Sequence, residues 1–331
     1  MLLRKRHLMG KNKKKKARYK VTNWPFYNKS LVERGSIILW VNDDLFIPSQ
    51  SPVKKSRGRP FSYSDGLIQG ILQLSLVYDL PLRATEGFFR SILSLMGKSD
   101  ALSPHYSTLC KRRKAMDIPQ IKAPNRNKDI IIAIDSTGLK IYGEGEWHVR
   151  KHGASKRRTW RKLHLAVDVD TSDIVASTLT TNDIDDAAIV PDLLEQITSK
   201  VGECSADGAY DKTKAREALY KYGIKQVIPP YVNAVIQDKN KKYNPALTER
   251  DQAIETIEAF GDDDLAKELW KILENYHKRS LSENAMYRRK TLFSPSLSSR
   301  QFKSQQVEAA LIINAMNKMT SCGMPISKRV I

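Results

Sequence analysis

The hydrophobic pattern of this 331-residue chain changes its period once, at the polar segment IKAPNRNKD (121–129). Before it, SDGLIQGILQLSLVYDL (64–80) and PLRATEGFFRSILSLMG (81–97) repeat apolar residues every three or four positions, the spacing of amphipathic helices. After it, DIIIAIDSTGL (129–139) and RKLHLAVDVD (161–170) are β-branched or alternating, as strands are. The chain is therefore predicted to be a helical region followed by a domain that contains a sheet.

Strands and helices alternate in this second part. A third strand, DIVASTLTT (173–181), follows at the spacing of an antiparallel meander, and a helix at 184–198 is kinked or broken at Pro191. GECSADGAYD (202–211) supplies another strand, and a helix, a short strand and a long helical stretch at 263–292 come after it. This order predicts the ribonuclease H-like architecture, an α/β fold with one mixed sheet and flanking helices.

The chain carries a large positive charge. It has 56 lysines and arginines against 36 aspartates and glutamates, a formal net charge of +20. Such an excess usually indicates a polyanionic partner, and nucleic acid is the leading candidate. Residues 1–20 hold ten of the basic side chains and no acidic one. This segment is too polar to bury a core, so we expect it to be disordered when free, with a solubilising tail or a cloning remnant as the alternative.

Two further basic segments lie between the tail and residue 120. In a linker at about 48–60, Arg57 and Arg59 form a short match to a minor-groove AT-hook, for which a plain basic linker is the alternative. SPHYSTLCKRRKAM (103–116) is a short helix that follows the two apolar ones, as in a helix-turn-helix arrangement. Its basic residues either enter a major groove or only complement the helix dipole. They are Lys111, Arg112, Arg113 and Lys114.

The loop between the first two strands of the predicted sheet is also basic. We expect it to contact a DNA backbone, with a solvated loop as the alternative. His148 and His152 have helical i, i+4 spacing, but no HExxH pattern surrounds them, so they are not expected to bind a metal. The candidate phosphate contacts in and beside this loop are His148, Arg157, Arg158 and Lys162.

Nothing in the sequence indicates secretion or a membrane. No apolar stretch approaches the roughly 18 residues of a membrane helix, and the first ten residues lack the apolar core and cleavage site of a signal peptide. The three cysteines lie far apart without CxxC spacing, which argues against a disulfide framework and a cysteine zinc site. We therefore expect a cytoplasmic protein.

Two aspartates follow apolar strands of the predicted sheet. Asp135 ends the first strand, in IAIDSTGLK, and Asp207 follows a later one, in SADGAYD. Neighbouring strand ends bring such side chains together, and crowded carboxylates suit Mg²⁺, or Mn²⁺ in its place. For each aspartate alone a strand-terminating turn is the alternative, because Gly138 and Gly208 follow closely. The other aspartates of the region resemble turn and cap residues: Asp168, Asp170, Asp183 and Asp186. Asp168 is also a candidate for a carboxylate that supports the metal ligands.

The third acidic candidate lies on a predicted helix. Four side chains there fall within roughly 60° of one face of a helix that turns about 100° per residue: Tyr276, Arg279, Glu283 and Lys290. A solvated face is the usual explanation of such a stripe, but a carboxylate framed by an arginine, a lysine and a phenol also suits a metal and a phosphate. With Asp135 and Asp207, Glu283 completes a set for two cations roughly 4 Å apart, which activate an attacking oxygen and stabilise the leaving oxygen of a phosphodiester.

These motifs resemble those of a bacterial insertion-sequence transposase of the DDE type, in the broad group related to insertion sequences 4 and 5. The resemblance is carried by IAIDSTGLK, by ADGAYD and by the spacing Tyr276-x2-Arg279-x3-Glu283-x6-Lys290, which is that group's tyrosine-arginine-glutamate-lysine signature. It extends over NWPFYNKSLVERGSIILW, the two apolar helices and WRKLHLAVDV, so it covers nearly the whole chain from about residue 19.

With the basic tail at 1–20, the predicted domains are a helical DNA-binding region at 21–120 and a ribonuclease H-like catalytic domain at 121–325. The resemblance implies Asp135, Asp207 and Glu283 as catalytic ligands of two Mg²⁺ ions. Tyr276, Arg279 and Lys290 are then expected to contact phosphates near the cleaved transposon end, as their donor chemistry allows.

The implied reaction is hydrolytic nicking at the terminal inverted repeats, followed by attack of the freed 3′-hydroxyl on target DNA. The implied partners are double-stranded DNA and a second copy of the chain when two ends are paired, with no nucleotide cofactor. A bacterial protein of this kind would be associated with the nucleoid through DNA.

One feature departs from larger relatives, some of which carry a β insertion before the glutamate helix. Here only residues 231–261 are available, and they are polar and lysine-rich, so a hairpin mechanism that relies on a flipped base is in doubt. Two other functions remain open. One is a metal-dependent nuclease of the same fold that cuts without joining. The other is a transposase-derived DNA-binding protein that represses through residues 64–115 without catalysis.

Overall fold

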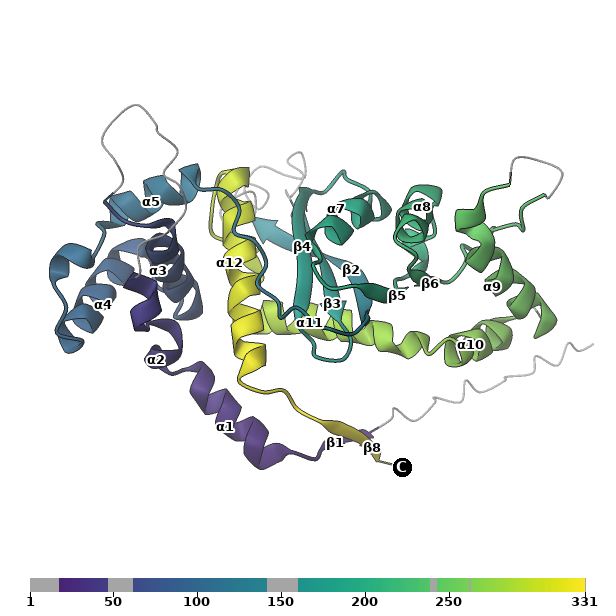
Figure 1. The fold of residues 1–331 in the computed structure, drawn as a ribbon, viewed down its shortest axis with the longest axis horizontal. Coiled ribbons are helices and arrows are strands. Elements are labelled where there is room, and N and C mark those ends of the chain that lie inside the picture. The colour runs from purple at the N-terminus through teal and green to yellow at the C-terminus, as the bar shows by residue number, and fades with distance from the viewer. Residues whose placement is uncertain (1–17, 47–61, 142–159, 239–242, 262, 331) are drawn as a thin grey trace, which may run out of the picture.

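The computed structural model describes residues 18–46, 62–141, 160–238, 243–261 and 263–330. Three predictions concern segments outside these ranges: most of the basic tail, the linker with Arg57 and Arg59, and the loop with His148, Arg157 and Arg158. Figure 1 shows a group of helices at one end, a sheet in the middle and further helices at the far end. We call the first group, residues 65–115, the helical end, and residues 130–297 the sheet domain.

The helical end follows the predicted pattern of two apolar helices and one basic helix. Ser64 caps the first helix by accepting a hydrogen bond from the Leu67 N–H at 3.2 Å. The helices are α3 (Asp65–Val77), α4 (Leu82–Leu95) and α5 (Tyr106–Ala115), with a 3₁₀ turn, η2 (Asp100–Leu102), before the last.

The first described segment combines a strand with short helices. It contains β1 (Arg18–Val21), α1 (Trp24–Arg34), α2 (Ile37–Trp40) and η1 (Asp43–Phe46). Residues 18–20, assigned to the disordered tail, lie in β1, which pairs antiparallel with β8 (Ser327–Val330). Residues 18–20 are ordered because β8 provides hydrogen-bond partners for their backbone, which the tail alone could not provide.

The central sheet has the strand order β4-β3-β2-β5-β6, with β7 also paired to β2. Its first three strands in the sequence are antiparallel neighbours, whereas β5 joins β2 and β6 joins β5 in parallel. The mixed sheet flanked by helices confirms the predicted ribonuclease H-like class. The strands are β2 (Ile130–Ile141), β3 (Trp160–Asp168), β4 (Ile174–Thr181), β5 (Val201–Ser205), β6 (Lys225–Val227) and β7 (Ser296–Leu297).

The helical connections of the sheet domain are shorter than predicted. Pro191 lies in the first turn of α7, directly after a 3₁₀ turn, because a first turn tolerates the missing N–H. The long stretch at 263–292 is interrupted at Asn275, whose φ is 53°. The elements are η3 (Asp186–Ile189), α7 (Val190–Gln196), η4 (Gly208–Tyr210), α8 (Thr213–Lys221), η5 (Pro245–Leu247), α9 (Thr248–Ala259), α10 (Asp264–Leu273), η6 (Tyr276–Arg279) and α11 (Ser280–Leu292).

A long helix that the sequence pattern did not predict, α12 (Phe302–Ser321), joins the two parts of the molecule. It lies between the helical end and the sheet in Figure 1. Its Leu311 and Met316 are almost fully buried in one core with Leu72 of α3 and Leu163 of β3. Burial of each such side chain stabilises the fold by roughly 1.5–3 kcal/mol. The other face of the sheet has a separate core beneath α7 and α8.

None of the helices in the described ranges combines the length and the apolar character needed to cross a bilayer.

Candidate active site

Asp135 and Asp207 are positioned by two neighbouring parallel strands, β2 and β5. Asp135 is inside β2, which continues to Ile141 because β3 and β7 pair with its second half, so the aspartate does not end the strand as predicted. The pairing of β2 with β5 stops at Ala133, just before it. Asp207 follows β5 and caps η4, since its Oδ1 accepts the Ala209 N–H at 2.9 Å. The turn role proposed for Asp207 and its place beside Asp135 are therefore compatible.

One guanidinium joins Asp135 to Glu283. Arg279 Nη1 donates to Asp135 Oδ2 at 3.1 Å, and its Nη2 makes a short contact with Glu283 Oε1. The Asp135 and Arg279 side chains are only 15% and 19% exposed, whereas Glu283 is 54% exposed. Hydrogen bonds between such charged groups are roughly twice as strong as neutral ones. The two carboxylates thus share a single cation.

The charges around Asp135 indicate how crowded the acidic groups are. Burial raises the pKa of the Asp135 carboxyl. The Ser136 N–H donates a hydrogen bond to Asp135 Oδ1 at 2.8 Å and lowers this pKa, as does the Arg279 guanidinium. The nearby Asp207 and Glu283 raise the pKa further. All three predicted acidic residues are therefore close enough to interact electrostatically.

Tyr276 faces the same group of carboxylates. Its ring lies 6.2 Å from that of Trp270, and the Arg279 guanidinium is 5.7 Å from the ring centroid. Burial raises the pKa of Tyr276 to about 12, and although Arg279 opposes this, the carboxylates at the site contribute in the same direction. The phenol consequently keeps its proton at neutral pH and remains a hydrogen-bond donor.

The helical face predicted for four residues is only partly continuous. Tyr276 and Arg279 belong to the 3₁₀ turn η6, Glu283 lies in the first turn of α11, and Asn275 breaks the helix before them. Lys290 is exposed about 10 Å further along α11 than Glu283. It makes no ion pair with any residue that the structure describes, so it lies apart from the network that the other three share.

The carboxylate oxygens of this site fit a hard divalent cation in their chemistry. Asp135 and Glu283 each direct one oxygen at the positive charge of Arg279, which shows that both carboxylates can face one cationic group. Over the described ranges, no three acidic, histidine or cysteine side chains come together as a finished metal-binding group. Arg279 pairs with two of the candidate ligands, Asp135 and Glu283.

A further carboxylate, Asp186, ties the strand that carries Asp135 to its surroundings. Its Oδ2 accepts from Ser136 Oγ at 2.8 Å, and its Oδ1 from Lys162 Nζ at 3.0 Å. The sequence pattern had indicated only a cap residue at Asp186, since nothing in it distinguishes this aspartate from its neighbour Asp185. Lys162, a predicted phosphate contact, has its charge directed inward because it also donates to the Ile184 carbonyl at 2.8 Å.

Asp168 does not support the site, although it was a candidate for that role. It ends β3 opposite Ile132, and its Oδ2 lies 3.2 Å from Arg126 Nε. It also accepts from the Asp170 N–H and Thr171 Oγ1, both at 2.9 Å. It is therefore a turn residue at the far end of the strand.

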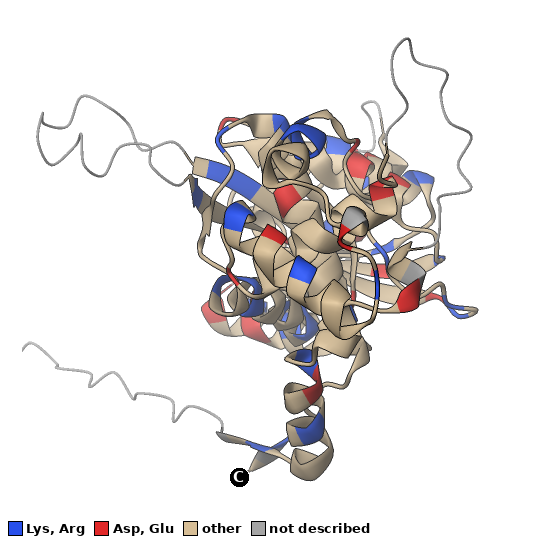
Figure 2. Cartoon of the chain, turned by 90° about the vertical axis from the view of Figure 1, so that its left-hand side faces the viewer, with Lys and Arg blue, Asp and Glu red and all other residues tan. Residues whose placement is uncertain are grey.

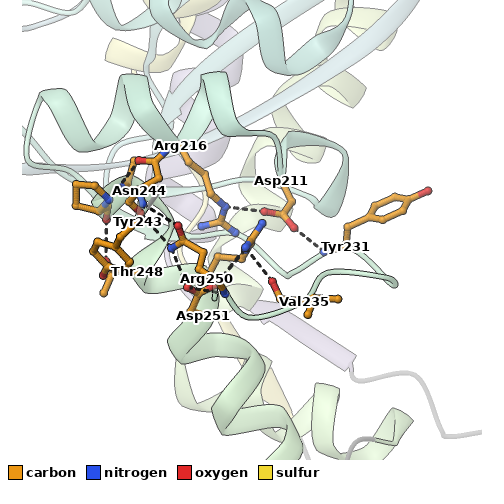
Figure 3. Close-up of polar contacts among 12 residues, drawn as sticks. Asp211, Arg216, Tyr231, Val235, Tyr243, Asn244, Thr248, Arg250 and Asp251 are labelled. Atoms are coloured by element: carbon orange, nitrogen blue, oxygen red, sulfur yellow. Dashed lines mark hydrogen bonds and ion pairs between the residues drawn. The ribbon is translucent and has the colours of Figure 1, made fainter. Parts of the chain in front are cut away.

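A cavity of about 490 Å³ opens beside Asp207, starting at Gly208 and Ala209. Figure 3 shows how its outer rim is held: Asp211 accepts the Tyr231 N–H at 2.6 Å, and Arg250 donates to the Val235 carbonyl at 3.0 Å. The Tyr231 side chain itself points outward and is exposed. The described parts of residues 231–261 form this rim, η5 and α9, and contain no strand.

The basic residues of α5 differ in their surroundings. Arg112 is buried, pairing with Asp65 at 2.5 Å and donating to the Tyr63 carbonyl at 2.9 Å, because it lies on the side of α5 that packs against α3. It is thus a structural residue in this fold and not an exposed basic group. Lys111 and Lys114 are exposed, and Arg113 is half-buried. Figure 2 looks onto this end of the molecule with basic positions in blue.

A ribonuclease H-like sheet with two strand-borne aspartates and a helix-borne glutamate defines a class of proteins with a carboxylate site. Two family models, each described as a transposase DDE domain, match residues 32–144 and 126–318. The second covers more than half of the chain, so the chain belongs to the transposase DDE domain family. The more specific grouping with insertion sequences 4 and 5 stays a prediction.

Two solved structures are distantly similar to this chain. A Drosophila P element transposase strand transfer complex gives 13% identity and a TM-score of 0.30 over 80% of this chain. A simian T-cell lymphotropic virus intasome in complex with PP2A regulatory subunit B56 gamma gives 15% identity and a TM-score of 0.23 over 57%. The chain spans 66% of the length of each. At these scores neither bears on the fold, which rests on the strand order.

Proposed function

We propose that this protein is a DNA transposase that binds the terminal inverted repeats of an insertion sequence, cleaves the phosphodiester at its ends and transfers the 3′-hydroxyl ends into target DNA. The observation that carries the proposal is the convergence of Asp135 and Glu283 on one cationic group beside Asp207. Membership of the transposase DDE domain family and the net charge of +20 support DNA as the partner.

In this proposal Asp135, Asp207 and Glu283 hold divalent cations, Mg²⁺ or Mn²⁺. When bound there, these cations activate the attacking oxygen and neutralise the charge on the scissile phosphate. Arg279 keeps its charge at every physiological pH and offers a planar fork to a phosphate. A DNA phosphate that binds the fork draws the guanidinium away from Asp135 and Glu283, which frees the two carboxylates as the substrate arrives.

Tyr276 and Lys290 complete the phosphate contacts in this proposal. The protonated phenol of Tyr276 donates one hydrogen bond, and Lys290, exposed on α11, supplies a point charge further along the DNA. The exposed Lys111 and Lys114 of α5 extend the same surface to the helical end. Pairing two transposon ends requires at least two copies of the chain on DNA.

The decisive experiment is the nearly isosteric change Glu283→Gln, assayed on DNA that carries the terminal repeats of the element. We expect cleavage with Mg²⁺ to fall by more than about 100-fold, because a cation ligand is removed. Binding to the same DNA should stay close to wild type. Glu274→Gln is the matched control, since Glu274 pairs with Lys225 outside the site and its replacement should leave cleavage intact.

Three results would argue for another function. Equal loss of binding and cleavage in Glu283→Gln makes the glutamate structural. Cleavage by the wild type without any joined product indicates a nuclease of the same fold. DNA binding with no cleavage under Mg²⁺ or Mn²⁺ indicates a transposase-derived DNA-binding protein.

A further inference from the structure

A cavity of about 360 Å³ lies where the helical end meets the sheet domain, between α5 and the segment that leads from β7 into α12. Its lining includes three cationic side chains, Arg113 and Lys114 from α5 and Arg300 from the β7–α12 segment, and no acidic residue. None of the three forms an ion pair with another described residue. Cations gathered around one cavity without counter-ions are typical of an anion site.

The same cavity lies at the N-terminus of α12, a helix of 20 residues. Gln301 occupies the N-cap position, and its side chain makes no capping hydrogen bond. The first N–H groups of a helix have no acceptor within the helix, and the helix dipole makes this end positive. Both effects favour an oxyanion at this place.

Ser304 supplies an independent indication of a ligand. Its side chain lines the cavity and is 3% exposed, and Oγ has no hydrogen-bond partner among the described residues. Arg113 Nε is likewise buried without a partner. Buried polar groups are nearly always hydrogen-bonded, so two unpaired donors from different parts of the chain at one cavity require an acceptor.

Glu308, one turn after Ser304, does not line the cavity and is already engaged elsewhere. Its oxygens accept the N–H groups of Ser298 and Ser299, each at 2.8 Å. The carboxylate therefore fixes the segment that forms one wall of the cavity and leaves the cationic side chains free for another anion.

We propose that this cavity binds a phosphate group of the DNA backbone through Arg113, Arg300, Ser304 Oγ and the first N–H groups of α12. The site chemistry requires an oxyanion of this kind, and its identification as DNA rests on the proposed function. One phosphate in the cavity contacts both α5 and the segment that continues β7. It therefore fixes DNA bound at the helical end relative to the strand that carries Asp135, since β7 pairs with β2.

Two native cysteines provide the test. Cys110 lines the cavity, whereas Cys322 follows the opposite end of α12, about 30 Å away along the helix, and both are partly accessible. Alkylation of the full chain by N-ethylmaleimide is followed at each cysteine by mass spectrometry. The three conditions are chloride alone, inorganic phosphate at the same ionic strength, and a short duplex DNA.

We expect phosphate and duplex to slow alkylation of Cys110 and to leave Cys322 unchanged. Arg300→Gln, and Ser304→Ala without any change of charge, should remove this protection while circular dichroism shows an intact fold. Lys303→Gln is the matched control, because Lys303 is an exposed neighbour on α12 that does not line the cavity. It should keep the protection.

Equilibrium binding of the duplex gives a second readout. Arg300→Gln should weaken binding by about tenfold, as the loss of one charge-assisted hydrogen bond does. It should also reduce the slope of log affinity against log salt by about one. If Lys303→Gln has an equal effect, binding depends only on the overall positive charge of the protein, and the proposed phosphate site is overturned.

The remaining outcomes separate this proposal from the proposed function. Protection by inorganic phosphate but not by a bound duplex makes the cavity a site for a free anion and overturns the assignment to DNA. Protection by neither, with the duplex bound normally, removes the site but not the transposase. No duplex binding at all contradicts the transposase itself, and the phosphate arm then still reports on the cavity.

Discussion

Arg279 contacts two acidic side chains at once, and this arrangement explains how these side chains can lie close together. An arginine keeps its charge at any pH at which the protein is folded. Its guanidinium therefore holds Asp135 and Glu283 close to Asp207, although like charges at such a place repel. The same positive charge is available to a phosphate. A single residue thus holds the acidic groups in position and can respond to DNA.

His164 gives a prediction for the dependence of stability on pH. It is buried on β3 opposite Ser136, with Nε2 2.9 Å from Thr180 Oγ1 and no hydrogen-bond partner at Nδ1 among the described residues. Burial lowers its pKa from 6.5 to about 4. The unfolded chain binds this proton below about pH 6.5 and the folded protein only near pH 4. The free energy of unfolding therefore falls as the pH is lowered from 6.5 to 4, by up to roughly 3 kcal/mol.

We expect His164→Gln to flatten the fall in the free energy of unfolding between pH 6.5 and 4, measured by urea unfolding at several pH values. The control is His277→Gln, since His277 is exposed and its replacement should leave the slope as in the wild type. A His164→Gln slope equal to that of the wild type would show that the histidine is not kept neutral by the fold.

Several individual residues were predicted at the right place, although their roles stay predictions. The structure brings Asp135, Asp207, Glu283, Arg279 and Tyr276 together. They could be predicted because the apolar strand patterns and the i, i+4 spacing of Arg279 and Glu283 are local signals. The inward-facing charges were not foreseeable in the same way. Arg112, Lys162 and Asp186 look like any other charged residues in the sequence, and only their tertiary partners distinguish them.

At the level of elements, the break between α10 and α11 is what turns the site residues inward. Asn275 adopts a left-handed conformation, and the chain then makes the 3₁₀ turn that carries Tyr276 and Arg279. This turn and the following α11, which carries Glu283, both pack against β2. Asparagine accepts this conformation more readily than most residues, and β-branched residues accept it least.

Asn275→Val should therefore destabilise the fold by about 1–2 kcal/mol and displace Tyr276 and Arg279. We expect a lower urea midpoint together with reduced cleavage of DNA ends. Asn275→Gly, which allows the same φ without strain, should keep both properties near wild type. If valine proves as stable and active as glycine, the left-handed turn has no part in positioning the site.

The helices that the sequence pattern did not predict, α9 and α12, lack a clear amphipathic pattern. Nearly every side of α12 is buried, so it shows no clear division into apolar and polar faces, and its Gln305, Glu308 and Asn317 are buried polar residues with partners elsewhere. α9 lies in a polar segment whose few apolar residues pack against Trp270. The strands, by contrast, were predictable because β-branched runs and alternation are local signals.

For the whole molecule, the ends of the described chain meet in the β1–β8 ribbon, while α12 joins the helical end and one face of the sheet in a single core. Basic groups are spread over this body, on α5, at the α12 junction and on α11. Residues 1–17 add eight lysines and arginines and no acidic residue. A long DNA that follows this surface would make phosphate contacts with several separate segments, and each such phosphate adds to the salt dependence of binding.

Removal of residues 1–17 tests whether the basic tail takes part in binding. The truncated protein keeps Arg18–Val21, so the β1–β8 ribbon can still form. If the tail binds phosphates, the slope of log affinity against log salt should fall by roughly 0.9 for each phosphate that the tail neutralises in the full chain. Equilibrium binding to one duplex over a series of KCl concentrations measures this slope. As a control, a variant of full length with the eight basic residues replaced by glutamine should match the truncation, because charge and not length carries the effect. An unchanged slope in both variants would leave DNA binding to residues 18–331 alone.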